Sequence, residues 1–492
     1  MRERLKTPLL ATLVAAQFLV MLDSSVLNVA LPAIAADLGL GAVGTAWVLN
    51  AYFLAFGGLL LIAGRAADVF GRRRMILTGA TVLAAGSFLG VAADTETVLV
   101  IARLVQGAGA AVLSPAAMSV ILATFTGRAR AQAMSLWGAA SAVGGATGVA
   151  AGGLLTAAVG WHGVLALSGV GAVLLAGATL LTAPRDGRGE RRRFDALGAV
   201  LATAAVVAVV YAVLAIPEQG FAAPTVLAAV AAAAAALAGL VVVERRSADP
   251  ILPPALFHEA RVVGGMIVNL AGGAARIGCF VLVALLLQHV LEYSPAAAGL
   301  AMLPTSLCGF AVSTLLLPRL LARFGPERVA FAGLLLLAAA HVWLVGVGPG
   351  AVYGFRILPA LLLAATGVAL SFTPTTLVIA DGIAARNAGV GSGLASATAQ
   401  LGGAIGIAVF GAVDAASCAA VLADGGTAQA AAGAGIHSAQ LAAAGFALAA
   451  GLIAALAFPK LRMPVTRRPI VASATAVDHL RMEEFRRVHP MR

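Results

Sequence analysis

The 492-residue sequence is poor in charged residues, aromatic residues and cysteine. Only 11% of its residues are charged and 5% are aromatic, whereas 61% are hydrophobic and the mean hydropathy is +1.00. Soluble domains carry about 25% charged and about 45–50% apolar residues, so this composition excludes an ordinary soluble protein. The net charge of +11 does not indicate nucleic-acid binding, because basic residues on one side of a membrane orient a membrane protein.

The scarcity of reactive groups limits the chemistry that the chain can perform. Its three cysteines, Cys279, Cys308 and Cys418, provide neither a disulfide framework nor a zinc site. The sequence contains no nucleotide-binding loop, metal cluster or nucleophile motif, so we expect no enzymatic activity and no cofactor or metal. Lysine is nearly absent while Arg, Ala and Gly are abundant, which indicates a GC-rich, bacterial genome.

Long apolar runs are the dominant feature of the sequence. We identify fourteen, each of about 20 residues, which is the length needed to cross a hydrocarbon core of about 30 Å as a helix. The first run begins near Pro8, and it is too long and too polar at Asp23 for a cleavable signal. The sequence therefore predicts an all-α integral membrane protein with 14 transmembrane helices.

Positive charges predict the orientation of these helices. With the N-terminus in the cytoplasm, all 32 Lys and Arg residues fall in cytoplasmic segments except three within apolar runs, namely Arg103, Arg276 and Arg356. The opposite loops carry acidic residues instead: Asp37, Asp94, Glu96, Glu218, Glu292 and Asp424. Cytoplasmic loops are enriched in Lys and Arg, so we expect a multi-pass protein of the bacterial inner (plasma) membrane with both termini in the cytoplasm.

An internal repeat divides the chain into two halves. GRAADVFGRRR (64–74) parallels PRLLARFGPER (318–328), with identical pairs Arg65/Arg319, Phe70/Phe324, Gly71/Gly325 and Arg74/Arg328. Two parallel six-helix halves are the duplication of one large transporter fold. The predicted domains are an N-terminal six-helix bundle (1–183), a basic cytoplasmic linker (184–194), two accessory membrane helices (195–243), a second cytoplasmic linker (244–260), a C-terminal six-helix bundle (261–459) and a polar cytoplasmic tail (460–492).

The segment GRAADVFGRRR resembles the signature loop of the major facilitator superfamily, Gly-x-Leu-Ala-Asp-Arg-x-Gly-Arg-Arg, except at Val69. In that family the loop braces the two halves in the outward-open state. The resemblance implies that Asp68 faces a helix N-terminus near Asn387, where the helix dipole favours an anion. We expect Gly64 and Gly71 to allow tight turns. The resemblance assigns conformational gating to Gly64, Asp68, Gly71, Arg72, Arg73 and Arg74.

Three further stretches are similar to the fourteen-helix drug:proton antiporter family. LDSSVLNVALPAI resembles its helix 1 motif, and RLVQGAGAA (103–111) resembles its helix 4 motif. The helix 5 motif is matched by Gly138, Gly144, Gly148, Gly152 and Gly153, although its prolines are replaced by Gly145 and Val149. Small residues at this spacing predict a face for close helix packing.

Asp23 is the acid that we expect deep within a membrane helix. At 1.5 Å per residue it lies about 10 Å below the outer end of helix 1, and Arg103 lies about 9 Å below that of helix 4. Neither charge is stable alone in lipid, so the two should face each other inside the bundle. Burial disfavours a charged carboxyl group and a guanidinium favours it, so the pair is a candidate for proton coupling, with a static ion pair as the alternative.

Other polar residues fall on helices expected to line a cavity. They are candidate substrate contacts or helix-packing hydrogen bonds: Gln17, Asn50, Gln106, Asn269, Arg276 and Gln400. One deep acid and two deep arginines should repel a cation and favour a neutral or anionic ligand. Pairing of Arg276 with backbone carbonyls is the alternative.

The resemblance implies transmembrane transport, namely proton-coupled export of lipophilic small molecules such as drugs, antibiotics or secondary metabolites. Such an antiporter works by rocker-switch alternating access and confers multidrug or antibiotic resistance. Expected partners are the small molecule, protons and the lipid bilayer, with no nucleic acid, and we expect a monomer. A nutrient facilitator or symporter of the same fold, and an integral-membrane enzyme or sensor, remain as alternatives.

Overall fold

The computed structural model describes residues 6–458 except 186–194, 221, 248–249, 251, 253 and 385–386. These residues form helices and connecting turns, with no strand among them. Most of the predicted basic linker (184–194) and the polar tail (460–492) lie outside the described residues. In the part described, 13 helices are long and apolar enough to cross a membrane.

Six spans form the N-terminal half. They come from five helices: α1 (Lys6–Leu38), α2 (Ala42–Phe70), α3 (Arg72–Val91), α4 (Glu96–Thr124) and α5 (Gly127–Thr182). The 56-residue helix α5 changes direction at Gly160, whose φ of 76° and ψ of 174° are not helical. Its arms, 127–159 and 161–182, are separate spans, which accounts for the difference between 13 helices and the 14 predicted.

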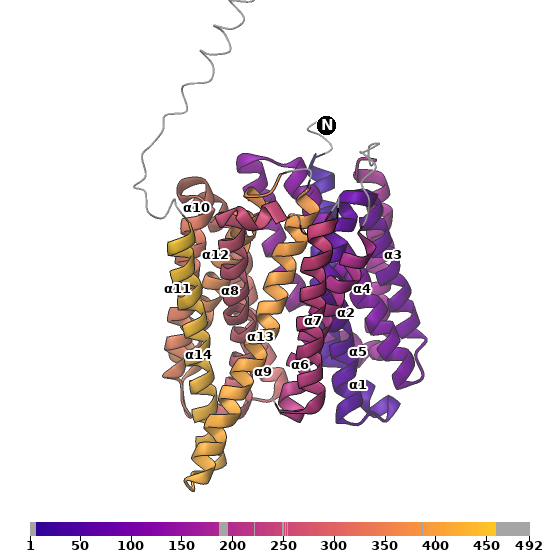
Figure 1. Ribbon diagram of the computed structural model, residues 1–492. Coiled ribbons are helices and arrows are strands. Elements are labelled where there is room, and N and C mark those ends of the chain that lie inside the picture. The colour runs from indigo at the N-terminus through magenta and orange to yellow at the C-terminus, as the bar shows by residue number, and fades with distance from the viewer. Residues whose placement is uncertain are drawn as a thin grey trace, which may run out of the picture.

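Two accessory helices follow, α6 (Ala196–Gln219) and α7 (Pro224–Arg246). Helix α6 packs on α2 of the first half and on α13 (Ala388–Ala423) of the second. The absence of a side chain at Gly58 allows Val207 to approach the α2 backbone. Helix α7 packs against α6 and is otherwise largely exposed, as expected for a lipid-facing segment (Figure 1).

Six further spans form the C-terminal half, and several include short π-helical turns. A 3-10 helix, η2 (Pro254–His258), precedes them. The spans are α8 (Ala260–Leu285) with η3 (Leu286–Val290), α9 (Pro295–Ala311) with η4 (Val312–Leu316) and α10 (Leu317–Phe324), α11 (Pro326–Val345), η5 (Tyr353–Ile357) with α12 (Leu358–Asp381), α13, and α14 (Ala428–Ala457). Figure 1 shows the two halves side by side, with the accessory helices beside α2 and α13.

The helices run between two chemically different ends of the bundle. We call the end at which α1 begins the basic end; it carries Arg72, Arg73, Arg74, Arg128, Arg130, Arg319 and Arg323. The opposite, acidic end carries Asp37, Asp94, Glu96, Glu292 and Asp424. Arg356 is an exception, because it is exposed at the acidic end, at the start of the α12 span.

The structure corrects two sequence-based expectations about helix boundaries. GRAADVFGRRR is not a loop, because α2 continues to Phe70 and α3 begins at Arg72. Gly71, with φ of 101°, makes the turn, as Gly325 does between α10 and α11 with φ of 79°. Gly64 lies within α2 and therefore makes no turn. Helix α13 continues to Ala423 and includes Asp414.

Candidate functional site

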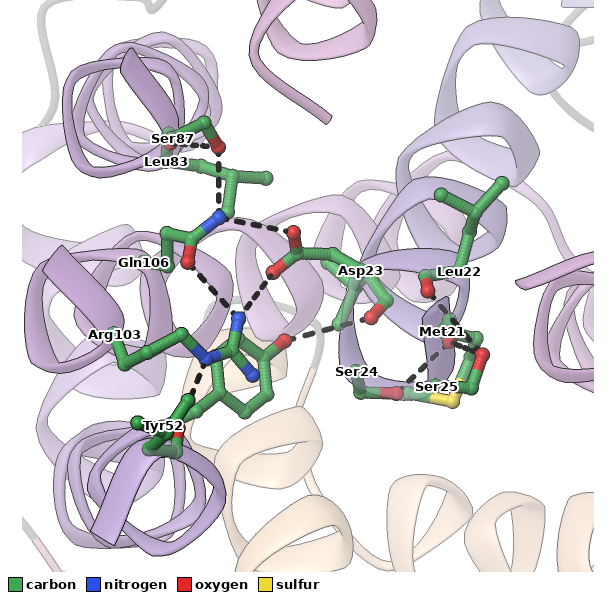
Figure 2. A network of polar contacts seen from close by, with 12 residues as sticks. Met21, Leu22, Asp23, Ser24, Ser25, Tyr52, Leu83, Ser87, Arg103 and Gln106 are labelled. Carbon is green, nitrogen blue, oxygen red and sulfur yellow. Dashed lines mark hydrogen bonds and ion pairs between the residues drawn. The ribbon is translucent and has the colours of Figure 1, made fainter. Parts of the chain in front are cut away.

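Asp23 lies completely buried within the N-terminal half, on α1. Its Oδ1 accepts a hydrogen bond of 3.1 Å from Gln106 Nε2 on α4 (Figure 2). Its Oδ2 lies 3.7 Å from Arg103 Nη1 and has no hydrogen-bond partner among the described residues. The carboxylate is therefore in ion-pair contact with Arg103, yet one of its oxygens retains unused acceptor capacity.

Arg103 is held in place by partners other than Asp23. Its Nη1 donates to Gln106 Oε1 at 2.9 Å and its Nε donates to the carbonyl oxygen of Val48 at 3.2 Å. The guanidinium lies over the Tyr52 ring, 4.3 Å from its centroid, and Arg103 and Tyr52 are both fully buried. Because three neighbours other than Asp23 orient it, Arg103 can stay in position while the charge on Asp23 changes.

Gln106 joins the acid and the base of this cluster. Its amide nitrogen donates to both Asp23 Oδ1 and Ser87 Oγ of α3, and its oxygen accepts from Arg103. Figure 2 shows these groups converging from α1, α2, α3 and α4. The sequence motif pointed to Gln106 as a possible cavity residue. The structure places it, fully buried, in the hydrogen-bond network of Asp23, which is the hydrogen-bonding alternative given above.

The glycines of α5 pack against α1 beside this cluster. A Cβ on Gly144 would lie 2.6 Å from the carbonyl oxygen of Phe18, and one on Gly148 would lie 2.8 Å from that of Leu22. Gly152 similarly approaches the backbone of Val26. Backbone contact of this kind permits close helix packing. It fixes the part of α1 on which Asp23 lies.

The other two glycines of that motif behave differently. Gly138 faces the second half, where its Cβ would lie 2.5 Å from Thr373 Oγ1 on α12. Gly153 is half-buried.

Asp68 joins the two halves at the basic end. Its Oδ1 and Oδ2 accept hydrogen bonds of 3.0 Å from the backbone N–H groups of Gly389 and Val390, in the first turn of α13. The geometry is that of an anion at a helix N-terminus, where the dipole and the free N–H groups both favour it. Arg72 also contacts Asp68, at 3.2 Å.

The arginines and glycines near Asp68 have distinct positions. Arg73 Nη2 donates to the carbonyl oxygen of Leu180 in the second arm of α5, at 2.9 Å, whereas Arg74 is exposed. Gly64 packs directly on the α13 backbone, since a Cβ there would lie 2.9 Å from Gly393 Cα. The structure thus gives Gly64 a role in close helix approach.

A second contact between the halves was not anticipated from the sequence. Arg130 Nη1, near the start of α5, donates to Asp381 Oδ1 at the end of α12, at 3.0 Å. The same guanidinium donates to the carbonyl oxygens of Leu122 and Phe125 at the C-terminal end of α4. The two charged residues are 251 positions apart, so no local pattern could have paired them.

The remaining candidate residues fall into two groups. Gln17 is buried between Ser141 and Ser114, with hydrogen bonds of 2.9 and 2.8 Å, and Asn269 is buried against α13. Asn50 and Gln400 are partly exposed. Arg276 is buried against Asn269.

In the described part of the chain, no group of three or more His, Cys, Asp or Glu side chains could hold a metal ion.

This arrangement of two six-helix halves is that of the major facilitator fold. The human organic anion transporter MFSD10 has a TM-score of 0.65 at 15% identity, covering 91% of this chain and 99% of that one. The transporter FucP, solved in the outward conformation, has a TM-score of 0.61 at 15% identity, covering 91% and 98%. At such identities these likenesses establish the fold alone.

Residues 13–407 match the profile of the Major Facilitator Superfamily, and the chain belongs to that family. It is 40% identical over 431 residues to the puromycin resistance protein pur8 of Streptomyces alboniger, covering 86% of this chain and 84% of that protein. It is 36% identical over 400 residues to the cephamycin export protein CmcT of Amycolatopsis lactamdurans, covering 80% and 82%. These similar proteins are associated by name with antibiotic resistance and export.

Proposed function

We propose that this protein exports lipophilic, antibiotic-like small molecules from a bacterial cell in exchange for protons. Its similarity to an antibiotic resistance protein and an antibiotic export protein over most of the chain supports export. The proton-coupling part of the proposal rests on one observation, the buried contact between Asp23 and Arg103.

Asp23 is suited to carry the transported proton. It is fully buried in the spanning part of α1, and its Oδ2 lacks a hydrogen-bond partner in the described structure. A carboxylate inside a membrane helix is a functional-site hypothesis by default, because retaining it is costly. Protonation at Oδ2 would remove the attraction to Arg103 Nη1, while Arg103 keeps its bonds to Gln106 and Val48.

Loss of that attraction provides a route from protonation to movement. Asp23 lies on α1 and Arg103 on α4, and α1 packs along the glycines of α5 without side chains between the backbones. Weakening the contact between Asp23 and Arg103 would therefore change the position of α1 relative to α4 while α1 stays packed on α5. In an alternating-access cycle such a change would couple proton release on one side to reorientation of the halves.

Contacts between the halves support an outward-facing state. Asp68 with α13, Arg130 with Asp381, and Ser392 Oγ with the carbonyl oxygen of Pro115 at 2.9 Å all lie toward the basic end. By the positive-inside rule the basic end faces the cytoplasm, with both termini on that side.

We propose that the bundles 1–183 and 261–459 move as rigid bodies, with the helices of 195–243 as accessory spans.

The test of this function is transport by purified protein in liposomes. The full chain is reconstituted, a pH gradient is imposed, and movement of puromycin, a cephamycin and a panel of lipophilic compounds is measured with and without a protonophore. Transport of at least one compound should require the gradient and be abolished by the protonophore. Transport that proceeds equally without a gradient would reject proton coupling, and no transport of any compound class would reject export.

A further inference from the structure

Arg276 is a buried cation of the C-terminal half without a carboxylate in contact with it among the described residues. The residue is 4% exposed. Its Nη2 donates to Asn269 Oδ1 at 2.7 Å and to the Asn269 carbonyl oxygen at 3.1 Å. Its Nη1 is buried and has no hydrogen-bond partner in the described chain. Arg103 has Asp23 as its counterion, whereas Arg276 has none among the described residues.

Arg276 contacts a residue of α12 that lies next to the surface where the halves meet. The Phe372 ring of α12 covers it, with Arg276 Cζ 5.7 Å from the ring centroid. Phe372 is partly exposed, and the next residue, Thr373, touches Gly138 of the first half. Movement of one aromatic side chain would therefore bring the guanidinium within reach of a molecule held between the halves.

A second link connects Arg276 to the contact between Asp68 and the first turn of α13 at the basic end. Asn269, which binds Arg276, donates from Nδ2 to the Ala395 carbonyl oxygen at 2.7 Å and to Thr398 Oγ1 at 3.0 Å. Both acceptors lie on α13, the helix whose first turn binds Asp68. A ligand bound to Arg276 would therefore be connected through Asn269 to α13, the helix that Asp68 of the first half contacts.

Building on the proposed export function, we propose that Arg276 is the charge-selective contact of the substrate site and binds the negatively charged group of a lipophilic organic anion. A buried charge is costly unless it is paired, and an anionic group would occupy the free donor of Nη1. A cationic ligand would be repelled by the same guanidinium. Phe372 would supply apolar surface for the rest of the ligand.

Two ions of nearly identical shape and opposite charge test this assignment. Tetraphenylborate and tetraphenylphosphonium differ chiefly in the sign of their charge, so the ratio of their affinities isolates electrostatic selection. Binding to the full chain in a neutral detergent is measured by equilibrium dialysis, with protein-free detergent as the blank. The wild-type protein should bind tetraphenylborate at least about tenfold more tightly, as one charge-assisted contact suggests.

Variants separate a selective role from a structural one. Arg276→Gln should reduce the ratio by about tenfold, whereas Arg276→Lys should keep the preference for the anion. Arg245→Gln, which removes an exposed charge at the end of α7, should leave the ratio unchanged. If Arg276→Gln cannot be purified, Phe372→Ala decides, because uncovering the guanidinium should raise the ratio.

Several results would overturn the assignment. These are a wild-type preference for tetraphenylphosphonium, no binding of either ion, or a ratio unaffected by both Arg276→Gln and Phe372→Ala. Loss of the preference in Arg276→Lys to the same degree as in Arg276→Gln would also overturn it, since a fixed positive charge would then not be sufficient. The assay uses no proton gradient, so it stands or fails separately from proton-coupled export.

Discussion

Gly64 of α2 and Gly393 of α13 are in backbone contact across the two halves of the protein. A Cβ on Gly64 would lie 2.9 Å from Gly393 Cα and would overlap the carbonyl oxygen of Gly389. The helices come this close beside Asp68, whose carboxylate binds the first turn of α13. The close approach and the charge contact therefore act at the same place, which makes this interface a latch at the basic end.

Gly64→Ala should weaken the latch without unfolding either half. The added methyl group meets backbone atoms that cannot rotate away, so α2 and α13 must separate by several tenths of an ångström. We expect a cysteine placed at the basic end of the interface to become more reactive toward a water-soluble maleimide. Gly57→Ala is the control, since its Cβ would meet only a Val210 methyl group at 3.7 Å. Equal reactivity in both variants would argue against the latch.

Asp68→Ala should slow transport while leaving equilibrium binding of substrate nearly unchanged. The side chain contacts α13 at the basic end and is remote from the Asp23 cluster, so its loss affects the balance between conformations. Two charge-assisted bonds to a helix N-terminus suggest a destabilisation of the latched state by about 2 kcal/mol. Turnover in liposomes and binding in detergent give the two readouts. A large fall in binding affinity would contradict the gating role.

Arg130→Gln should disturb the latched state more than Asp381→Asn. Both side chains of this ion pair are partly exposed, at 22% and 36%, so the pair alone contributes only about 0.5 kcal/mol. Arg130 additionally binds two carbonyl oxygens at the end of α4, and these bonds survive the loss of Asp381. Maleimide labelling of the basic end, with the double variant completing a mutant cycle, measures the difference. If both variants have the same effect, the backbone contacts of Arg130 are unimportant.

Gly148→Ala should destabilise the protein and Gly145→Ala should not. A Cβ on Gly148 would lie 2.8 Å from the carbonyl oxygen of Leu22, whereas nothing lies within 4 Å of a Cβ on Gly145. Overpacking typically costs about 1–3 kcal/mol, and Ala is favoured over Gly in a helix by about 1 kcal/mol. The unfolding temperature in detergent should therefore fall for the first variant and stay level or rise for the second. The reverse order would show that α1 does not pack closely on this face of α5.

Asp23→Asn should fold and reach the membrane but lose proton-driven export. An amide has nearly the same shape and keeps an oxygen to accept the bond from Gln106, yet it cannot gain or lose a proton in this pH range. We expect gradient-driven efflux to be lost, because an intramembrane acid suited to relay protons is replaced by a group that cannot bind or release one. Asp94→Asn, an exposed acid at the acidic end, is the matched control. Undiminished proton-driven efflux in Asp23→Asn would remove Asp23 from the coupling mechanism.

The sequence alone determined the fold class, the spans and the resemblance to a transporter family. Apolar run length and the sidedness of arginine are properties of single segments and their flanks, so they can be read without knowing how the segments pack. The similar depths of Asp23 and Arg103 followed from the helix rise of 1.5 Å per residue in the same way. Asp68 facing the start of α13 followed from the family resemblance, and the structure shows those bonds.

Only the tertiary structure decided which side chains meet. Gln106 bridging Asp23 and Arg103, Arg130 pairing with Asp381, and Gly64 abutting α13 depend on how each helix is rotated about its axis. That rotation is set by packing against helices far away in the sequence, and an almost uniformly apolar membrane helix carries little periodic signal to reveal it. The sequence indicated that Arg276 lies deep in the bundle, because depth follows from position along a single helix. Its contacts with Asn269 and Phe372 depend on helix rotation, so only the structure showed them.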